Sequence, residues 1–274
     1  MRGCLPPLAC LVVFFSFAAP AAFSQSLTGG ARAVALGGAA TALHDDAWGH
    51  VNPAVWAVRP GRAVSFFAGQ AFGLPELRLG AVQYVEPTRA GAFALGARTF
   101  GFEAFRETHL DLGYARGFAF GTTRRLYAGL RLRYYRVVIA RYGSGGALGV
   151  SAGWLVRILP TLYAGFQATN LNRPKLAGRE EFERTLGLGL GYVADERLRV
   201  LVDVIKDVRF PLSVRAGLEL APVPALALRA GATTEPTRFT AGLGVRLGRL
   251  AADVAAEHHS VLGWSPAFSL GVLW

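Results

Sequence analysis

From about Gly61 to Trp274 the chain repeats one pattern: eight to twelve residues in which every second one is apolar, followed by a short break of glycine, proline or charged residues. A β-strand has a side-chain period of two, so each repeat predicts a strand with one apolar face and one mixed face. The last repeat runs to the carboxy terminus and places Phe268, Leu270, Val272 and Trp274 on one face. The pattern predicts an all-β protein.

The predicted strands are longer than those of soluble β-sandwiches, which usually have about five or six residues. In residues 123–137, for example, leucine and alanine side chains share one face, while tyrosine, glycine, Arg131 and Arg133 share the other. A soluble sandwich also alternates, but an arginine that faces lipid at the middle of a bilayer costs roughly 2–4 kcal/mol. The alternation therefore predicts a membrane barrel, with lipid against the apolar face and the mixed face in the lumen.

Fourteen strands can be placed in the sequence, an even number, as a closed antiparallel single-chain bacterial barrel requires. The predicted strands are 62–72, 76–86, 90–101, 106–118, 123–138, 146–157, 161–170, 184–194, 197–207, 211–220, 225–233, 237–247, 249–257 and 265–274.

The connections between these strands alternate in length. The two longest, Ile139–Gly145 and Leu171–Glu183, are odd-numbered, while most even-numbered ones are tight turns, such as Leu159-Pro160 and Pro222-Val223-Pro224. Outer-membrane barrels have short periplasmic turns and longer outer loops. This alternation of long and short connections therefore predicts that both ends of the barrel domain, residues 61–274, lie on the periplasmic side.

The first 24 residues have the features of an export signal. Arg2 is followed by an apolar stretch from Leu8 to Phe17 and by a small-x-small site at residues 22–24. Both cysteines, Cys4 and Cys10, fall inside this segment. We expect residues 1–24 to be removed and the protein to reside in the cell outer membrane, and we expect no disulfide or cysteine metal site in the mature chain.

The formal net charge is +11, with 29 lysine and arginine residues, but the arginines are spread over the strands without a dense basic run. This spacing argues against nucleic acid as a partner. The mixed faces instead predict a charged lumen, which could favour anions or could hold a filled lumen together through ion pairs. The predicted lumen-lining residues are Arg98, Asp111, Arg131, Arg133, Asp203, Arg215, Glu219, Arg229, Arg246, Asp253 and Glu257.

The segment before the barrel, residues 25–60, carries the most specific motif. It contains three blocks, Arg32 to Gly38, Asp45-Asp46-Ala47 and Asn52-Pro53-Ala54. Gly37 and Gly38 permit backbone torsions that other residues avoid, the aspartates can accept backbone N–H groups or pair with arginine, and Asn-Pro initiates turns. These residues could shape turns without binding any ligand.

The three blocks, in this order and spacing, resemble the amino-terminal signature of the FadL-like superfamily of outer-membrane proteins, and within it the PorV/PorQ group of type IX secretion proteins. The resemblance covers about thirty residues; beyond them it concerns the architecture. It implies that residues 25–60 form a plug against or inside the periplasmic end of a fourteen-stranded barrel.

The PorV/PorQ resemblance implies a role in type IX secretion or surface attachment, through contacts with secretion-system proteins or secreted substrates. The alternative is a FadL-type transporter that takes a hydrophobic small molecule through a side opening in the wall. An apolar lumen pocket would favour transport, and a lumen filled by the plug and polar pairs would favour the partner-binding role. Outer-membrane lipid is the expected surrounding in either case.

The sequence predicts neither catalysis nor a cofactor. A hydrolase would need a base and an acid converging on Ser260, yet neighbouring residues of a strand point to opposite faces, so the His258-His259-Ser260 cluster is a poor triad. His109 near Asp111 is a second, isolated pair. His44 and His50 flank the aspartates, but their spacing makes a weak metal-ligand set.

Overall fold

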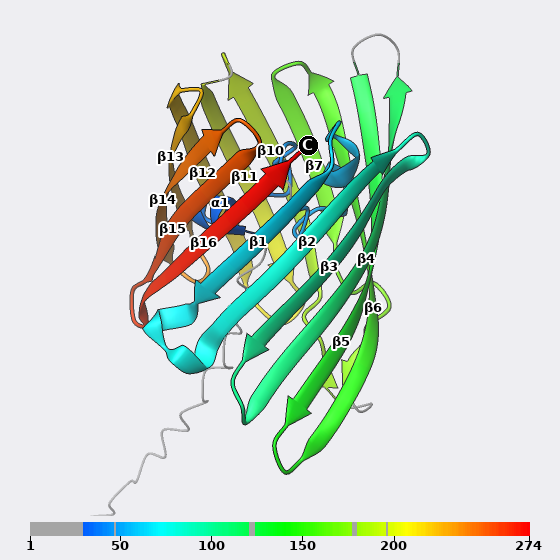
Figure 1. The fold of residues 1–274 in the computed structure, drawn as a ribbon, viewed down its shortest axis with the longest axis vertical. Helices are drawn as coiled ribbons and strands as arrows, with labels where there is room; N and C mark the ends of the chain where they lie inside the picture. Colours follow the sequence, from blue (N-terminus) through cyan, green and yellow to red (C-terminus); the bar gives the residue numbers. More distant parts are fainter. Residues whose placement is uncertain (1–29, 47, 121–123, 177–179, 196) are drawn as a thin grey trace, which may run out of the picture.

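The strands form one closed antiparallel barrel in which each hydrogen-bonds to its neighbours and β1 pairs with β16 (Figure 1). The computed structural model describes residues 30–46, 48–120, 124–176, 180–195 and 197–274. The predicted export signal and the first residues of the predicted plug lie outside these ranges. The barrel strands are β1 (Ala63–Gln70), β2 (Arg78–Thr88), β3 (Gly91–Gly101), β4 (Phe105–Phe120), β5 (Arg124–Ile139), β6 (Gly143–Leu159), β7 (Leu162–Ala168), β10 (Thr185–Ala194), β11 (Leu198–Asp207), β12 (Leu212–Val223), β13 (Leu226–Thr233), β14 (Arg238–Leu247), β15 (Leu250–His259) and β16 (Gly263–Leu273).

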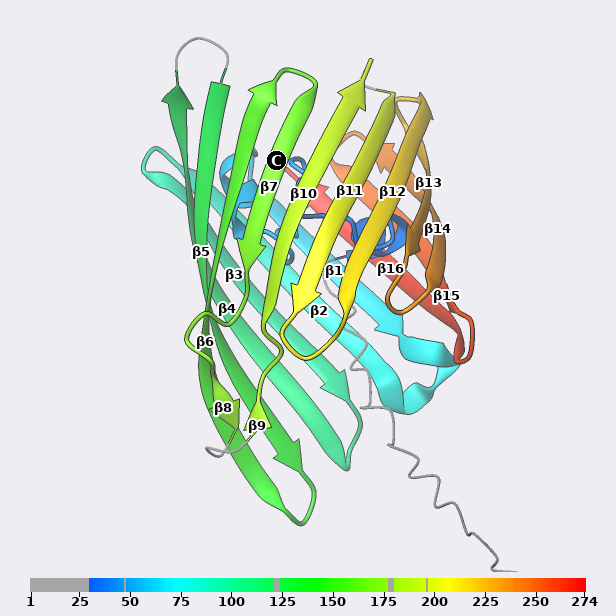
Figure 2. The ribbon, with the colours of Figure 1, turned by 180° about the vertical axis from the view of Figure 1, so that it is seen from behind.

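The predicted fourteen-stranded antiparallel barrel is confirmed, and each predicted strand has its counterpart. Two connections differ from the prediction. The β5–β6 connection is a tight turn rather than a long loop, because β6 already begins at Gly143. The long connection after β7 contains a small hairpin, β8 (Lys175–Leu176) and β9 (Glu180–Glu181), which pairs separately from the barrel (Figure 2).

The wall is uneven in height. Strands β4, β5 and β6 have 16, 16 and 17 residues, whereas β7 has 7. A β-strand needs about 9–11 residues to cross a bilayer, so the β4–β6 panel extends beyond a membrane-spanning length. This panel projects at the end opposite the carboxy terminus (Figure 1). We call the end with the carboxy terminus and turns such as β12–β13 and β14–β15 the short-turn end.

The outer surface of the barrel is apolar. Leu130 on β5 and Leu188 on β10 are 57% and 61% exposed, and similar side chains recur on the outward face of the other strands. The alternate residues of the same strands are buried, as the pattern of β10 illustrates. Exposed apolar side chains around a cylinder whose inward side chains include buried arginine and acidic residues match the lipid-facing band of a membrane barrel. No helix in the described ranges has the length and hydropathy needed to cross a membrane.

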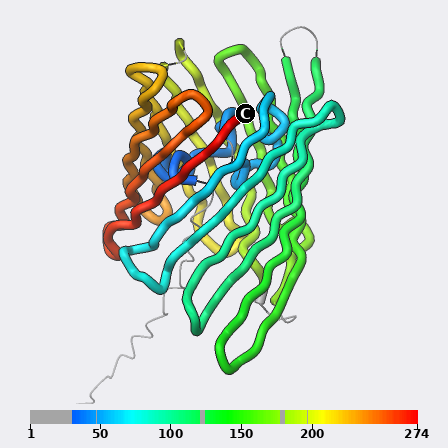
Figure 3. The backbone as a smooth tube through the Cα atoms, viewed as in Figure 1, coloured from blue at the N-terminus to red at the C-terminus, as the bar shows by residue number. Residues whose placement is uncertain are grey.

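Residues 30–60 lie inside the ring of strands (Figures 1 and 3). They contain helix α1 (Gly30–Ala35) and the 3-10 helix η1 (Pro53–Ala57), and two further 3-10 turns, η2 (Ala71–Gly73) and η3 (Pro75–Leu77), follow β1. Helix α1 contacts β13 to β16, and η1 contacts β3 to β6. This lumen segment therefore crosses from one wall to the other and contributes to each of the four buried apolar clusters.

Small residues on the inner wall leave space for the lumen segment. An added Cβ at Gly153 of β6 would overlap the side chains of Asn52 and Pro53, and one at Gly231 of β13 would overlap the backbone at Gly37. Neither glycine has a positive φ, so close approach rather than backbone torsion requires glycine at these two positions.

Candidate functional site

Arg32 of α1 is the centre of an ion-pair network in the lumen. Its Nε and Nη2 lie 2.8 and 2.7 Å from the two carboxylate oxygens of Glu219 on β12. Its Nη1 lies 3.0 Å from Oδ1 of Asp45. Arg32 and Glu219 are both buried. A guanidinium that pairs with two carboxylates in this forked geometry fixes the position of α1 against the wall.

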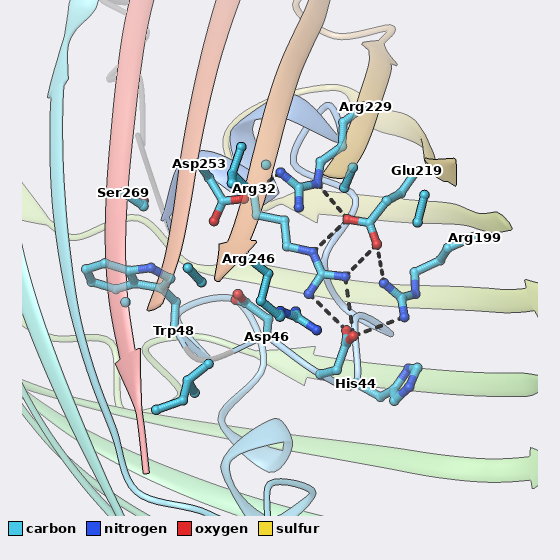
Figure 4. A pocket seen from close by; sticks show the side chains of 18 of the residues that line it. Arg32, His44, Asp46, Trp48, Arg199, Glu219, Arg229, Arg246, Asp253 and Ser269 are labelled. Carbon is cyan, nitrogen blue, oxygen red and sulfur yellow. Dashed lines mark hydrogen bonds and ion pairs between the residues drawn. The ribbon is translucent and has the colours of Figure 1, made fainter. Parts of the chain in front are cut away.

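The network continues across three wall strands (Figure 4). Arg199 of β11 pairs with Glu219 and, at 3.0 Å, with Asp45. Arg229 of β13 places Nε 2.6 Å from Glu219 and Nη1 2.6 Å from Asp253 of β15. Three arginines thus meet three carboxylates, so the network is electrically balanced and ties the lumen segment to the wall.

A cavity of about 510 Å³ lies beside this network. Its lining includes Arg59, Tyr163 and Arg246 together with residues at or next to the short turns β6–β7, β12–β13 and β14–β15. Its position shows that it belongs to the short-turn end of the lumen. Ligand pockets commonly enclose about 300–1,000 Å³ but are mostly apolar, whereas this one is bordered by the charged network in Figure 4.

Burial shifts the ionisation of the lumen segment beside the cavity. Burial raises the pKa of Asp46 to about 6, although Arg32 opposes the shift. Burial also lowers the pKa of His44 to about 4, and its ring stacks on Tyr163 with 3.8 Å between the ring centroids. Asp45 behaves differently: Arg32 and Arg199 outweigh burial and hold the pKa of this carboxyl well below its usual range.

A second charged cluster lies on the opposite wall. Arg133 of β5 binds Asp111 of β4 through two hydrogen bonds of 2.6 and 2.8 Å. Arg131 donates to the backbone carbonyl of His50 at 2.5 Å. Arg98 of β3 donates to Nδ1 of His109 at 2.5 and 3.2 Å rather than to a carboxylate. This wall carries more positive than negative charge.

The remaining predicted lumen residues also lie on the inner face, but their partners vary. Asp203 accepts a hydrogen bond of 2.8 Å from the backbone of Thr41, and Arg215 is its cross-strand neighbour. Glu257 pairs with Arg238 at 3.1 Å. Arg246 lines the cavity, and no ion pair holds it within the described part of the chain.

The glycine block of the lumen segment forms a turn. Gly37 and Gly38 have φ values of 66° and 72°, in the left-handed region that favours glycine. The N–H of Gly37 donates to Oγ1 of Thr240 at 2.9 Å, and its carbonyl accepts from Thr233 at 3.0 Å. The guanidinium of Arg215 reaches the carbonyl of Gly38 at 3.5 Å. These hydrogen bonds hold the end of α1 against β12, β13 and β14.

The Asn-Pro-Ala block forms a cap. The Asn52 side chain accepts a hydrogen bond from Ala54 N at 3.0 Å, and Pro53 occupies the first turn of η1. The Asn52 amide also donates to the carbonyls of Thr41 and Trp154, at 2.8 and 3.0 Å. Asparagine is favoured at N-caps because its oxygen satisfies a free N–H. Here the same side chain joins both parts of the lumen segment to β6.

Sequence reasoning missed Arg199 and Thr240. Both lie on the inward face by the alternation of their strands. Arg199 is on the same face of β11 as Asp203, and Thr240 is on the same face of β14 as the inward glycines. The pattern therefore contained the signal for their inward direction. Their partners in the lumen segment could not be read from it, because pairing across about 150 residues or more depends on how the segment enters the lumen.

His258 and His259, next to Ser260, have partners within the β15–β16 hairpin. His258 packs on Trp264, with 4.7 Å between ring centroids, and His259 Nδ1 accepts backbone N–H groups from Val261 and Leu262. Ser260 lies in the β15–β16 turn. Across the described ranges, no three His, Asp or Glu side chains are grouped as a metal site would require.

No protein-family model and no curated protein matches the chain. Solved structures do match. The toluene transporter TodX of Pseudomonas putida superposes with a TM-score of 0.60 and 12% identity, over 90% of this chain and 97% of that one. A FadL homologue of Pseudomonas aeruginosa superposes with a TM-score of 0.60 and 11% identity, over 90% of this chain and 98% of that one. The monoaromatic hydrocarbon channel CymD superposes with a TM-score of 0.59 and 12% identity, over 89% of this chain and 96% of that one. The chain therefore has the fold of the FadL-type channels.

Proposed function

We propose that this protein is a FadL-type channel that carries a hydrophobic small molecule across the outer membrane. The observation that supports this function best is the superposition of about the whole barrel on the toluene transporter and on the other hydrocarbon channel. The apolar outer surface suits a bilayer. On this proposal the short turns face the periplasm, and the protein transports without catalysing a reaction.

Apolar surface beside the lumen segment supports a hydrophobic cargo. Trp48 and the α1 side chain Val34 pack with Phe67 and Leu79 of the wall in one buried cluster. Phe72 and Phe100 border this cluster, and both are partly exposed. Phe72 belongs to η2, in a connection at the end opposite the short turns. A hydrophobic molecule that enters from that end meets an aromatic surface before it reaches the charged network.

The lumen segment must move for cargo to pass, because it crosses the lumen and is bound to both walls. An engineered disulfide tests this directly. An ideal Cβ at Gly191 of β10 would lie 3.5 Å from Cβ of Ala42 in the lumen segment, which is within the range of about 3.5–4.5 Å that a disulfide needs. The chain has no cysteine after Cys10, so A42C/G191C would introduce the only pair in the mature protein.

The A42C/G191C variant should take up labelled toluene or fatty acid into proteoliposomes when reduced and should stop when oxidised. The single variants A42C and G191C are the matched controls and should be insensitive to oxidation. Uptake by the oxidised double variant at the reduced rate would reject a route that needs the segment to move. Absence of uptake by the wild-type protein for every hydrophobic probe would reject transport itself.

A partner-binding role like that implied by the PorV/PorQ resemblance is the second candidate. It is motivated by the charged network around Arg32, whose polar pairs occupy this part of the lumen. A dedicated apolar pocket in the same place would instead favour transport. Deleting the gene and comparing surface-attached secreted proteins with uptake of labelled fatty acids separates the two candidates. Loss of the surface proteins with normal uptake would favour the secretion role, and the reverse would favour transport.

A further inference from the structure

Positive charge is concentrated at the short-turn end of the barrel. Arginines at or next to the turns of this end include Arg59, Arg89, Arg125, Arg157, Arg246 and Arg249. Within the described ranges, the acids of the strands and turns at this level are Glu86 and Asp195, and Asp45 and Asp46 of the lumen segment act on Arg59. Glu86 is already bound by a further arginine, Arg62, at 2.9 Å. The remaining arginines of this rim greatly exceed the acids that could neutralise them.

The opposite end is more balanced. Its basic residues, such as Arg78, Arg106 and Arg209, are interspersed with acids. These acids include Glu76, Glu103, Glu107, Glu181, Asp207 and Glu235. The net charge of +11 is therefore not spread evenly along the barrel axis, and the short-turn end holds much of the excess.

Four of the rim arginines, Arg59, Arg125, Arg157 and Arg246, belong to the lumen side; we call them the mouth arginines. Arg125 and Arg157 lie on the same face of β5 and β6 as the buried residues Tyr127 and Leu155, and they are direct cross-strand partners. Like charges directly opposite each other on one face of a sheet repel. Arg157 hydrogen-bonds with Tyr163, but no carboxylate pairs with Arg125 or Arg246 in the described part of the chain.

Two of the mouth arginines, Arg59 and Arg246, line the 510 Å³ cavity, and so does Tyr163, the partner of Arg157. The deeper arginines around Glu219 are already neutralised by carboxylates, so they leave no charge for a ligand. Arg59 donates one hydrogen bond to the carbonyl of Asp45, and its buried Nε has no partner. A buried donor without a partner destabilises the state that leaves it unsatisfied, and an incoming acceptor would satisfy it.

We propose that the mouth arginines bind an acidic polypeptide segment that approaches the short-turn end from outside the barrel. Arg125 and Arg157 are neighbours on β5 and β6, Arg246 comes from β14 on another part of the wall, and Arg59 comes from the lumen segment. A single small anion would reach only some of them, whereas an extended peptide carries several carboxylates. Because these side chains belong to the inner face, they do not serve as contacts for lipid headgroups. Guanidinium groups bind carboxylates strongly through paired hydrogen bonds.

This inference goes beyond the proposed transport, which assigns no partner to the short-turn end. If that end faces the periplasm, as proposed above, the partner is a periplasmic protein with an exposed acidic segment. Binding itself is independent of orientation and of cargo, so its test does not depend on transport.

The test is the fluorescence anisotropy of a labelled oligoglutamate peptide, titrated with the purified full chain in a neutral detergent. The variant R59Q/R125Q/R246Q should weaken binding by roughly tenfold or more, because it removes three of the four mouth charges that would pair with the peptide carboxylates. The control R78Q/R106Q/R136Q removes the same charge from the opposite end and should change binding less than about twofold. Heat-modifiable migration on gels confirms that each variant is folded.

Three results would overturn the inference. The first is that both triple variants weaken binding equally, and the second is that the wild-type chain does not bind the peptide. The third is that inorganic phosphate, at a concentration equal to that of the peptide's carboxylates, displaces the peptide completely, which would indicate a small-anion site. A photoreactive residue gives the location: cross-linking at Ala225 in the β12–β13 turn supports the inference. Cross-linking confined to Val261, in the β15–β16 turn at the opposite end, contradicts it.

Discussion

Arg32 and Glu219 lie 187 residues apart in the sequence, yet they form a forked ion pair with contacts of 2.7 and 2.8 Å inside the barrel. Arg32→Gln would remove one of the cations that hold buried Glu219 and half-exposed Asp45, while Arg199 still contacts both carboxylates and Arg229 still contacts Glu219. Breaking one side of a buried pair costs about 3–5 kcal/mol. Because other arginines still contact these carboxylates, we expect a smaller loss in the free energy of unfolding, of about 2 kcal/mol for the charge-assisted hydrogen bonds removed, measured by urea titration of the protein in lipid vesicles.

The control for this measurement is Arg62→Gln. Arg62 pairs with Glu86 at the rim of the barrel, and its side chain is 53% exposed. Exposed pairs contribute less than about 1 kcal/mol. If both variants lost the same amount, the ion-pair network would not be what holds the lumen segment in place.

The second prediction concerns the space left by Gly153. Gly153→Ala would place a Cβ against Asn52 and Pro53, and Asn52 would then lose its bond to the carbonyl of Trp154. Overpacking of this kind costs about 1–3 kcal/mol. We expect faster proteolysis within residues 30–60 while the barrel keeps its heat-modifiable migration. The matched change Gly80→Ala meets its nearest atom at 3.8 Å and should leave proteolysis unchanged.

The third prediction is a pH dependence of lumen-segment docking. Burial lowers the pKa of His50 from 6.5 to about 3. The released segment therefore takes up a proton below 6.5 while the docked one does not, so docking weakens as the pH falls from 6.5 towards 3. His44 acts in the same direction. We expect the midpoint of urea unfolding to fall across this window and the fall to be smaller in His50→Gln.

Asp46 opposes this trend and provides its control. Burial raises the pKa of Asp46 from 3.8 to about 6. The docked state then holds the proton that the released state has lost, so Asp46 weakens docking as the pH rises from 3.8 to about 6. Asp46→Asn should therefore steepen the gain in stability over that range. An identical pH profile in Asp46→Asn and the wild type would show that this carboxyl does not titrate while docked.

The strand order and the facing of side chains were predictable because both depend on local alternation. A residue such as Arg133 must point inward if its neighbours Leu132 and Tyr134 point to lipid, and this needs no knowledge of the partner. Loop lengths were less predictable, because residues 143–145 continue β6 although glycine and serine there indicate a loop.

The pairings of the lumen segment were not predictable from the sequence. Asp203 was expected to pair with arginine, but it binds the backbone of Thr41, and a backbone N–H leaves no trace in the sequence pattern. The partners of Arg32 required the path of residues 30–60 through the lumen, which follows from the positions of wall glycines such as Gly153 and Gly231. These glycines are recognisable as small residues, but their contacts appear only in three dimensions.

The last prediction tests which face of the wall meets lipid. Leu130 lies near the middle of β5, points outward and is 57% exposed, while its neighbour Arg131 is buried in the lumen. Leu130→Arg should cost roughly 2–4 kcal/mol if hydrocarbon surrounds this position. Leu247 ends β14 at the short-turn end and is 66% exposed, so Leu247→Arg should cost about 0–1 kcal/mol. Urea unfolding in lipid vesicles measures both, and equal costs would mean that Leu130 does not face the bilayer core.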